Sequence, residues 1–201
     1  MNFLAHIYLS GDNDLITIGN FIADGIKGKH YKKYPKDIQI GIRLHREIDT
    51  FTDAHPTVRL STKRLHKNYS HYSGVIVDIL YDHFLAKNWS HYSHVPLADY
   101  VDDFYASLKT HAEYLTPRSQ TMVPYMIAGN WLLNYGKVEG IQNVLNGMNQ
   151  RTNNISGMDK ATNELKKYYQ EFEAEFTSFF EELRLFSAEK LATLKQMHTL
   201  E

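Results

Sequence analysis

The chain has 201 residues, of which 43% are hydrophobic and 22% are charged, and its formal net charge is -1. These values are ordinary for globular proteins and exclude a disordered or collagen-like chain. There is no cysteine, which excludes disulfide frameworks, thiolate metal sites and cysteine nucleophiles. No apolar run reaches the roughly 20 residues that span a bilayer, and the N-terminus lacks the features of a secretory signal. The sequence therefore predicts a soluble, cytoplasmic protein that does not bind membranes.

Apolar residues recur with helical spacing along nearly the whole chain, and alternation with period two is almost absent. This pattern predicts an all-α protein with a single domain over residues 1–201. Proline and glycine residues separate the periodic segments, and the polar stretch 148–154 is typical of a loop. We predict helices at about 12–28, 36–54, 57–68, 73–91, 97–114, 121–134, 137–147 and 158–194. The last helix carries an aromatic stripe, which indicates packing in the core.

The predicted helix 12–28 places Asn20 and Asp24 together, on the side opposite its apolar stripe. In the predicted helix 36–54, His45 and Asp49 are separated by one turn and extend an apolar stripe. They are either a buried pair that satisfies itself or a pair that binds a ligand. Taken alone, Asp24 is more typical of a surface residue than of a ligand.

The predicted helix 73–91 is apolar on nearly every side, yet it contains Asp78 and Asp82 one turn apart, followed by His83. Two ionised carboxylates on one buried face repel each other and lose hydration, so they need a cation or a proton. His6 is a weaker candidate in a short apolar opening segment. We expect no role in the site for six further histidines near predicted helix ends or in polar surroundings: His55, His66, His71, His91, His94 and His111.

Three helices with carboxylate or histidine side chains in apolar surroundings predict a metal site. Histidine and carboxylate donors suit Mn²⁺, Mg²⁺, Fe²⁺ or Zn²⁺. The chain contains no phosphate-binding glycine loop, dinucleotide-binding fingerprint or serine-hydrolase elbow. The remaining chemistry is attack of a metal-activated water on an electrophile such as a phosphoryl group.

Charge is distributed unevenly, because residues 1–70 carry 11 Lys/Arg and 7 Asp/Glu, whereas residues 71–201 carry 11 and 16. A basic segment without a basic excess overall favours an acidic protein partner over a nucleic acid. The alternative is that these basic side chains are simply a solvated surface without a binding role. The basic side chains that would form a docking face are Lys27, Lys29, Lys32, Lys33, Arg43, Arg46, Arg59, Lys63, Arg64 and Lys67.

Five segments with recognisable motifs occur in one order: Asn2–His6, Gly19–Asp24, Gly41–Pro56, Asp78–Leu85 and Gln142–Met148. Together they resemble the bacterial acyl carrier protein phosphodiesterases, a family related to the HD metal-dependent phosphohydrolases. The resemblance implies an all-helical, HD-like architecture. It further implies Mn²⁺-dependent cleavage of 4′-phosphopantetheine from the serine of holo-acyl carrier protein. The chain departs from the HD pattern because it has no His-Asp dipeptide, only the reversed Asp82-His83.

We therefore predict a metal site formed by Asp24, His45, Asp78 and Asp82. Asp49 either ligates the metal or orients His45 as a catalytic residue. His83 is the predicted catalytic residue that handles the proton of the serine leaving group.

The predicted substrate-binding residues are Arg43, Arg46, Asn20 and Lys27. Two alternatives stay open. One is an HD-like phosphohydrolase that acts on a nucleotide or another small phosphodiester, and the other is a non-catalytic helical module that binds an acidic protein. The oligomeric state is left open.

Overall fold

The computed structural model describes residues 1–199, and these residues form helices and connecting turns without a strand. The prediction of an all-α protein is confirmed. Within the described residues no helix is both long and apolar enough to cross a membrane. The α-helices, in chain order, are α1 (Phe3–Tyr8), α2 (Asp14–Ile22), α3 (Lys36–Ala54), α4 (Pro56–Tyr69), α5 (Ser73–Lys87), α6 (Leu97–Thr110), α7 (Pro117–Ala128), α8 (Trp131–Asn134), α9 (Val138–Arg151), α10 (Thr162–Lys167) and α11 (Tyr169–Thr199).

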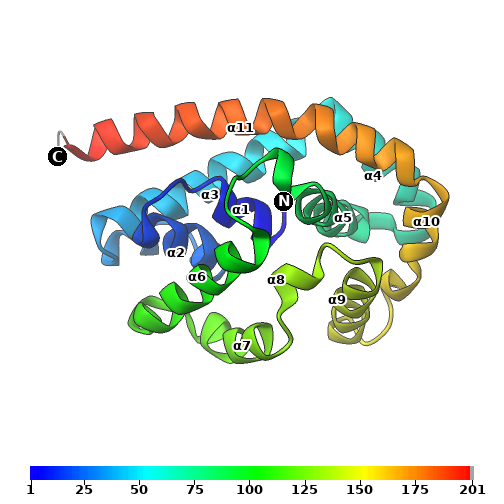
Figure 1. Ribbon diagram of the computed structural model, residues 1–201, viewed down its shortest axis with the longest axis horizontal. Coiled ribbons are helices and arrows are strands. Elements are labelled where there is room, and N and C mark those ends of the chain that lie inside the picture. Colours follow the sequence, from blue (N-terminus) through cyan, green and yellow to red (C-terminus); the bar gives the residue numbers. More distant parts are fainter. Residues whose placement is uncertain (200–201) are drawn as a thin grey trace.

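Helix α5 lies in the middle of the molecule, in contact with α1, α4, α9 and α11 (Figure 1). Apolar residues cover nearly all of its sides, and Leu80, Phe84 and Leu85 are completely buried. A helix that is hydrophobic all round is stable only when other elements surround it. Polar side chains on α5 therefore lie inside the molecule or at the wall of a cavity.

Helices α2 and α3 pack so closely that two glycines are required where they cross. A Cβ atom added to Gly19 would collide with the backbone of Ile38, and one added to Gly41 would collide with the backbone of Ile16. The absence of a side chain at these positions allows the two backbones to approach. This close packing brings the C-terminal end of α2 next to the middle of α3.

Helix α11 lies across α3, α4 and α5 (Figure 1). Its aromatic stripe is fully buried at Phe172, Phe176, Phe179 and Phe180, as the periodicity predicts. The predicted helix 158–194 is divided, because the backbone of Tyr168 leaves the helical region between α10 and α11. Burial of the aromatic stripe anchors α11 along the core.

Differences from the predicted elements are concentrated at helix ends. The predicted helix 12–28 ends at Ile22 and continues as two short 3₁₀ turns, Ala23–Gly25 and His30–Lys33. Gly28 lies between these turns with a φ of 53°, a conformation that interrupts a right-handed helix. The predicted helix 121–134 is divided at Asn130, which has a φ of 42°.

Two other differences affect the site described below. The sequence predicts no helix before residue 12, whereas α1 forms there. The predicted loop 148–154 is helical up to Arg151, because α9 is one turn longer than expected. Both segments contribute side chains or backbone groups to the interior of the molecule.

Candidate functional site

Two histidines and an aspartate from α1 and α3 come together at one point. The rings of His6 and His45 are stacked with their centroids 4.0 Å apart. The Nε2 atom of His6 lies 3.2 Å from Oδ1 of Asp49, and Nε2 of His45 lies 3.1 Å from Oδ2 of the same carboxylate. Asp49 therefore contacts both imidazoles, one through each oxygen.

The end of α2 contributes two further groups to this cluster. Oδ1 of Asn20 lies 3.1 Å from Nδ1 of His45, and Oδ1 of Asp24 lies 3.2 Å from Nε2 of the same ring. The Asn20 amide nitrogen donates to the carbonyl of His6 and to Oγ of Ser10, so its oxygen is directed at His45. That oxygen can only accept, which fixes a proton on Nδ1 of His45 and directs Nε2 toward the two carboxylates.

The two imidazoles have opposite electrostatic character. Burial, together with the charge of the neighbouring His45, lowers the pKa of His6 to about 4, so this ring is neutral. Burial also opposes the charged form of His45, but hydrogen bonds to Asp24 and Asp49 outweigh it and raise the pKa to about 9. The same contact with His45 holds the pKa of Asp24 below its usual value. Burial acts to raise the pKa of Asp49, but its hydrogen bonds with His45 and His6 have the larger effect, so the pKa of Asp49 is lowered overall.

Asp78 of α5 faces the same cluster. Its Oδ1 lies 3.1 Å from the amino group of Met1, which is itself 4.0 Å from Asp49. Burial raises the pKa of Asp78, and the positive charge of the amino group offsets part of this effect. The carboxylate is thus held at the wall of the site by charge complementarity.

A cavity of about 340 Å³ lies over these residues; it is the candidate active site, and we call it the active-site cavity. His6, Asp24, His45, Asp49 and Asp78 all line it. The same cavity is also lined by Arg118 of α7 and Arg151 of α9. Both arginines are exposed, and neither forms an ion pair with a residue in the described part of the chain.

The cluster satisfies the chemical requirements of a divalent cation site. His6, His45 and Asp49 can each direct one ligand atom to a common point, with those atoms within 4.8 Å of one another. Nδ1 of His6 is buried without a hydrogen-bond partner among the described residues, whereas Nε2 of the same ring has only the contact with Asp49. A buried polar atom without a partner is costly, and coordination of a metal removes this cost.

The position of Asp82 gives this residue a different role from the predicted one. It is completely buried, and its two oxygens accept hydrogen bonds from the backbone N–H groups of Leu4 and Ala5, at 2.7 and 3.2 Å. Burial raises its pKa to about 7 although these two donors lower it. Asp82 therefore caps the first turn of α1 and does not line the active-site cavity. The expectation that it ligates a metal is corrected accordingly.

His83 also does not line the active-site cavity. Its Nδ1 donates to the backbone carbonyl of Tyr135 at 2.7 Å, and the hydroxyl group of Tyr169 lies 2.9 Å from its Nε2. Burial lowers its pKa. Both ring nitrogens have partners away from the cavity lining, so we replace the predicted proton-transfer role of His83 by a structural one.

We expect Asp82→Ala to destabilise the protein, because it orphans two buried N–H groups of α1. Each orphaned group costs about 1–3 kcal/mol of the free energy of unfolding. Asp82→Asn retains one acceptor oxygen and should lose less. Urea denaturation measures both variants, and metal binding at saturating concentration should survive in each folded variant. Loss of metal from a folded, stable Asp82→Asn protein would contradict this assignment.

The predicted substrate-binding residues lie largely outside the cavity. Asn20 lines it but is completely buried and acts on His45. Arg46 donates to the carbonyl of Ile26 and covers the ring of Tyr31. Arg43 lies near Met197 of α11, and Lys27 is exposed without lining the cavity. The structure brings together Asp24, His45, Asp49 and Asp78, but it replaces the predicted arginines with Arg118 and Arg151.

Comparisons with known proteins show which proteins this chain is similar to. A sequence profile of the family described as acyl carrier protein phosphodiesterase matches residues 1–183. The acyl carrier protein phosphodiesterase of Photorhabdus laumondii is 31% identical over 181 residues, which cover 90% of this chain and 91% of that protein. Its namesake from Yersinia pestis is 30% identical, with 90% and 94% covered, and that from Salmonella agona is 32% identical over 191 residues, with 94% and 99% covered. No solved structure matches the chain, so an HD-like architecture stays a prediction.

Proposed function

Because the chain belongs to the acyl carrier protein phosphodiesterase family, we propose that it removes 4′-phosphopantetheine from the serine of holo-acyl carrier protein. One observation supports this most strongly. The active-site cavity combines a cluster of histidine and aspartate side chains with two exposed arginines that have no acidic partner among the described residues. This combination suits a phosphodiester, whose charge needs cationic groups on more than one side.

We propose that the cofactor is a divalent cation, Mn²⁺, held by His6, His45 and Asp49 with Asp24 beside them. Such a cation supplies Lewis acidity, which lowers the pKa of a water molecule and offsets the charge of the phosphoryl group. The neutral state of His6 leaves a ring nitrogen free to act as a ligand. Asn20 fixes the tautomer of His45 through Nδ1, as hydrogen-bond partners of ligating histidines commonly do.

Side chains of the cavity account for the rest of the reaction. In hydrolysis the oxygen of water bonds to phosphorus, the bond from phosphorus to the serine oxygen breaks, and that oxygen takes up a proton. Arg118 and Arg151 bind the phosphoryl oxygens, for which the planar guanidinium is well suited. Asp78 lines the cavity, and burial raises its pKa whereas the pKa values of Asp24 and Asp49 are lowered, so of these three carboxyl groups it is the one best suited to carry the proton to the serine oxygen.

The test of this function is mass spectrometry of holo-acyl carrier protein incubated with the purified protein and Mn²⁺. We expect conversion to the apo form with release of 4′-phosphopantetheine, arrest on chelation, and recovery when Mn²⁺ is added back. Turnover of small phosphodiesters with no change in holo-acyl carrier protein would favour the small-substrate alternative. An absence of both activities with Mn²⁺ bound would contradict the proposal.

A basic groove of about 630 Å³ adjoins the active-site cavity, since Asp53 and Asp78 line both. Arg59, Lys63 and Lys67 follow each other at one-turn intervals on α4 and line this groove. All three are exposed, and none forms an ion pair with a described residue. We propose that the acidic carrier protein docks here, because complementary charge speeds and orients association.

The docking surface is smaller than the sequence expectation, because Arg59, Lys63 and Lys67 are the only ones of the ten predicted basic residues that line the groove. Arg64 is not available for docking, because both of its terminal nitrogens are bonded to the carboxylate of Glu175 on α11, at 2.7 and 2.6 Å. Burial and pairing make this a structural contact between α4 and α11. The free charges lie on the neighbouring face of α4.

We expect the double charge reversal Lys63→Glu/Lys67→Glu to raise KM for holo-acyl carrier protein by about tenfold or more at low salt, since charges outside the chemistry act on association. Steady-state kinetics measure this effect, and KM of the wild-type protein should rise with salt. The matched control, Lys109→Glu/Lys160→Glu, changes two exposed lysines that line neither cavity nor groove. Equal effects of the two double variants would contradict docking on α4.

A further inference from the structure

A second cavity, of about 230 Å³, adjoins the active-site cavity and has no role in the chemistry described above; we call it the side pocket. Asn2, Phe3, Met148 and Arg151 line both cavities. The two spaces are therefore neighbours that share a wall and a cationic group. A ligand whose phosphate lies near Arg151 can extend from one cavity into the other.

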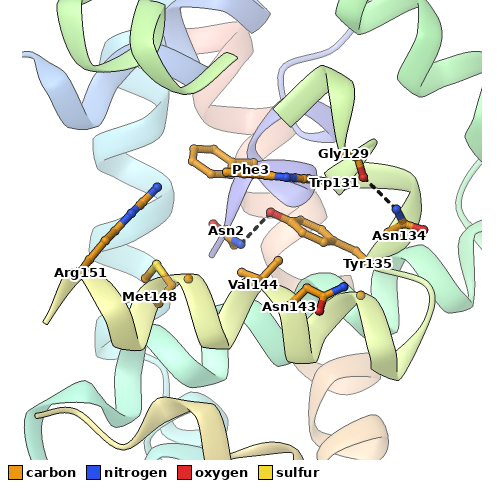
Figure 2. Close-up of a pocket in the computed structure, with 12 residues that line it drawn as sticks. Asn2, Phe3, Gly129, Trp131, Asn134, Tyr135, Asn143, Val144, Met148 and Arg151 are labelled. Carbon is orange, nitrogen blue, oxygen red and sulfur yellow. Dashed lines mark hydrogen bonds between the residues drawn. The ribbon is translucent and has the colours of Figure 1, made fainter. Parts of the chain in front are cut away.

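The walls of the side pocket are mainly apolar and aromatic. Figure 2 shows Phe3 and Trp131 on one side and Val144 and Met148 of α9 on the other, with Tyr135 between them. Such walls disfavour a charged occupant, because a buried charge without a partner loses its hydration. Arg151 is the charged residue of the lining and lies toward one end of the α9 segment in Figure 2.

Amide side chains supply the polar groups of the side pocket. The Asn2 amide donates to the hydroxyl group of Tyr135, and that of Asn134 donates to the carbonyl of Gly129 (Figure 2). Asn143 lines the pocket, and its exposed side chain has no hydrogen-bond partner among the described residues. A free amide in an apolar pocket can both donate to and accept from an amide of a ligand.

We propose that the side pocket binds the pantetheine arm of the substrate, an inference that rests on the proposed function. From the phosphate the arm runs through a methylene group, a dimethyl-substituted carbon and a carbon that bears a hydroxyl group. It continues through two amides separated by short aliphatic segments, ends in a thiol and carries no charge beyond the phosphate. This sequence of groups matches a pocket with a cationic end next to the active-site cavity, apolar walls and a free amide. Trp131, Tyr135 and Asn143 are thus residues that select the arm.

Gly147 provides a way to close the side pocket without disturbing its surroundings. It lines the pocket from α9, and a Cβ added there would meet no atom within 4 Å. A larger side chain therefore extends into open space, and leucine has a higher helix propensity than glycine. Gly147→Leu should fill the pocket while α9 stays folded.

The experiment that tests this proposal is titration of the protein with free 4′-phosphopantetheine, with binding monitored by tryptophan fluorescence. Trp131 lines the side pocket whereas Trp89, the other tryptophan, is buried in the core. We expect a saturable change in emission that is lost in Trp131→Phe and absent with inorganic phosphate alone.

Gly147→Leu should weaken binding by about tenfold or more, as expected when a shaped pocket is obstructed. The matched control Gln150→Leu adds the same side chain to an exposed position of α9 outside the pocket and should bind as the wild type does.

Hydrolysis of holo-acyl carrier protein by the same variants separates this inference from the proposed function. If the wild type hydrolyses the substrate and Gly147→Leu has the same KM and the same affinity for the free arm, the side-pocket assignment is overturned and the function stands. If the wild type is inactive but binds the arm in a Gly147-dependent manner, the function fails and the assignment stands. Binding that requires an acyl chain on the thiol would show a different occupant and overturn the assignment.

Discussion

Replacing His45 with alanine is expected to lower kcat for holo-acyl carrier protein by more than about a hundredfold, since loss of even an indirect partner of a metal ligand costs roughly 10–100-fold. His45 is the centre of the cluster, because Asn20, Asp24 and Asp49 all contact its ring. Its loss removes a ligand and leaves two carboxylates without their common partner. Bound Mn²⁺, measured by elemental analysis, should fall in parallel with activity.

Circular dichroism and urea denaturation establish that His45→Ala is folded before its activity is interpreted. His91→Ala is the matched control, because His91 is exposed and lines neither the active-site cavity nor the side pocket. A second variant, Asp24→Asn, changes a side chain that is 58% exposed and tests the same cluster with less risk to folding. A folded His45→Ala protein with the activity and metal content of the wild type would refute the assignment of this cluster.

The double variant Arg118→Ala/Arg151→Ala is expected to lower kcat/KM by about 10²–10³, the range found when a single group that stabilises transition-state charge is removed. Both guanidinium groups line the active-site cavity without an ion pair to any described carboxylate. The charge that they would neutralise is that of the phosphoryl group, so the loss should appear with every phosphodiester substrate. Stopped assays with holo-acyl carrier protein and a small chromogenic phosphodiester measure it.

Lysine substitutions at the same two positions separate the effect of the positive charge from that of the guanidinium geometry. Arg118→Lys/Arg151→Lys retains the charge but not the bidentate geometry of the guanidinium, so its activity should lie between those of the wild type and the alanine variant. Arg184→Ala is the matched control, since Arg184 on α11 pairs with Glu181 and does not line the cavity. Wild-type kinetics in the double alanine variant would show that the phosphoryl group binds elsewhere.

Helical periodicity predicts much of this fold because most helices have one apolar face, and the core residues of α3 and α11 follow that rule. The same periodicity places His45 and Asp49 on one face of their helix. It could not predict α1, because a helix of six residues contains too few turns for a periodic signal. His6 is therefore a weak candidate on sequence grounds, although in the structure it contacts both His45 and Asp49.

The error at Asp82 has a different origin. A carboxylate on an apolar helix must find a partner, and the sequence correctly indicates that requirement. It cannot identify the partner, which proves to be the backbone of Leu4 and Ala5, far away in the chain. The sequence does not identify Arg118 and Arg151 as site residues, because exposed arginines on helices are common. Only the tertiary structure brings these two to one cavity.

The measurement that tests the account most directly is anomalous diffraction from crystals of the protein grown with Mn²⁺. We predict one strong peak per chain within bonding distance of Nε2 of His6, Nε2 of His45 and a carboxylate oxygen of Asp49. A peak elsewhere, or none at a Mn²⁺ concentration that supports hydrolysis in solution, would contradict the proposal that these helices converge to hold the catalytic cation.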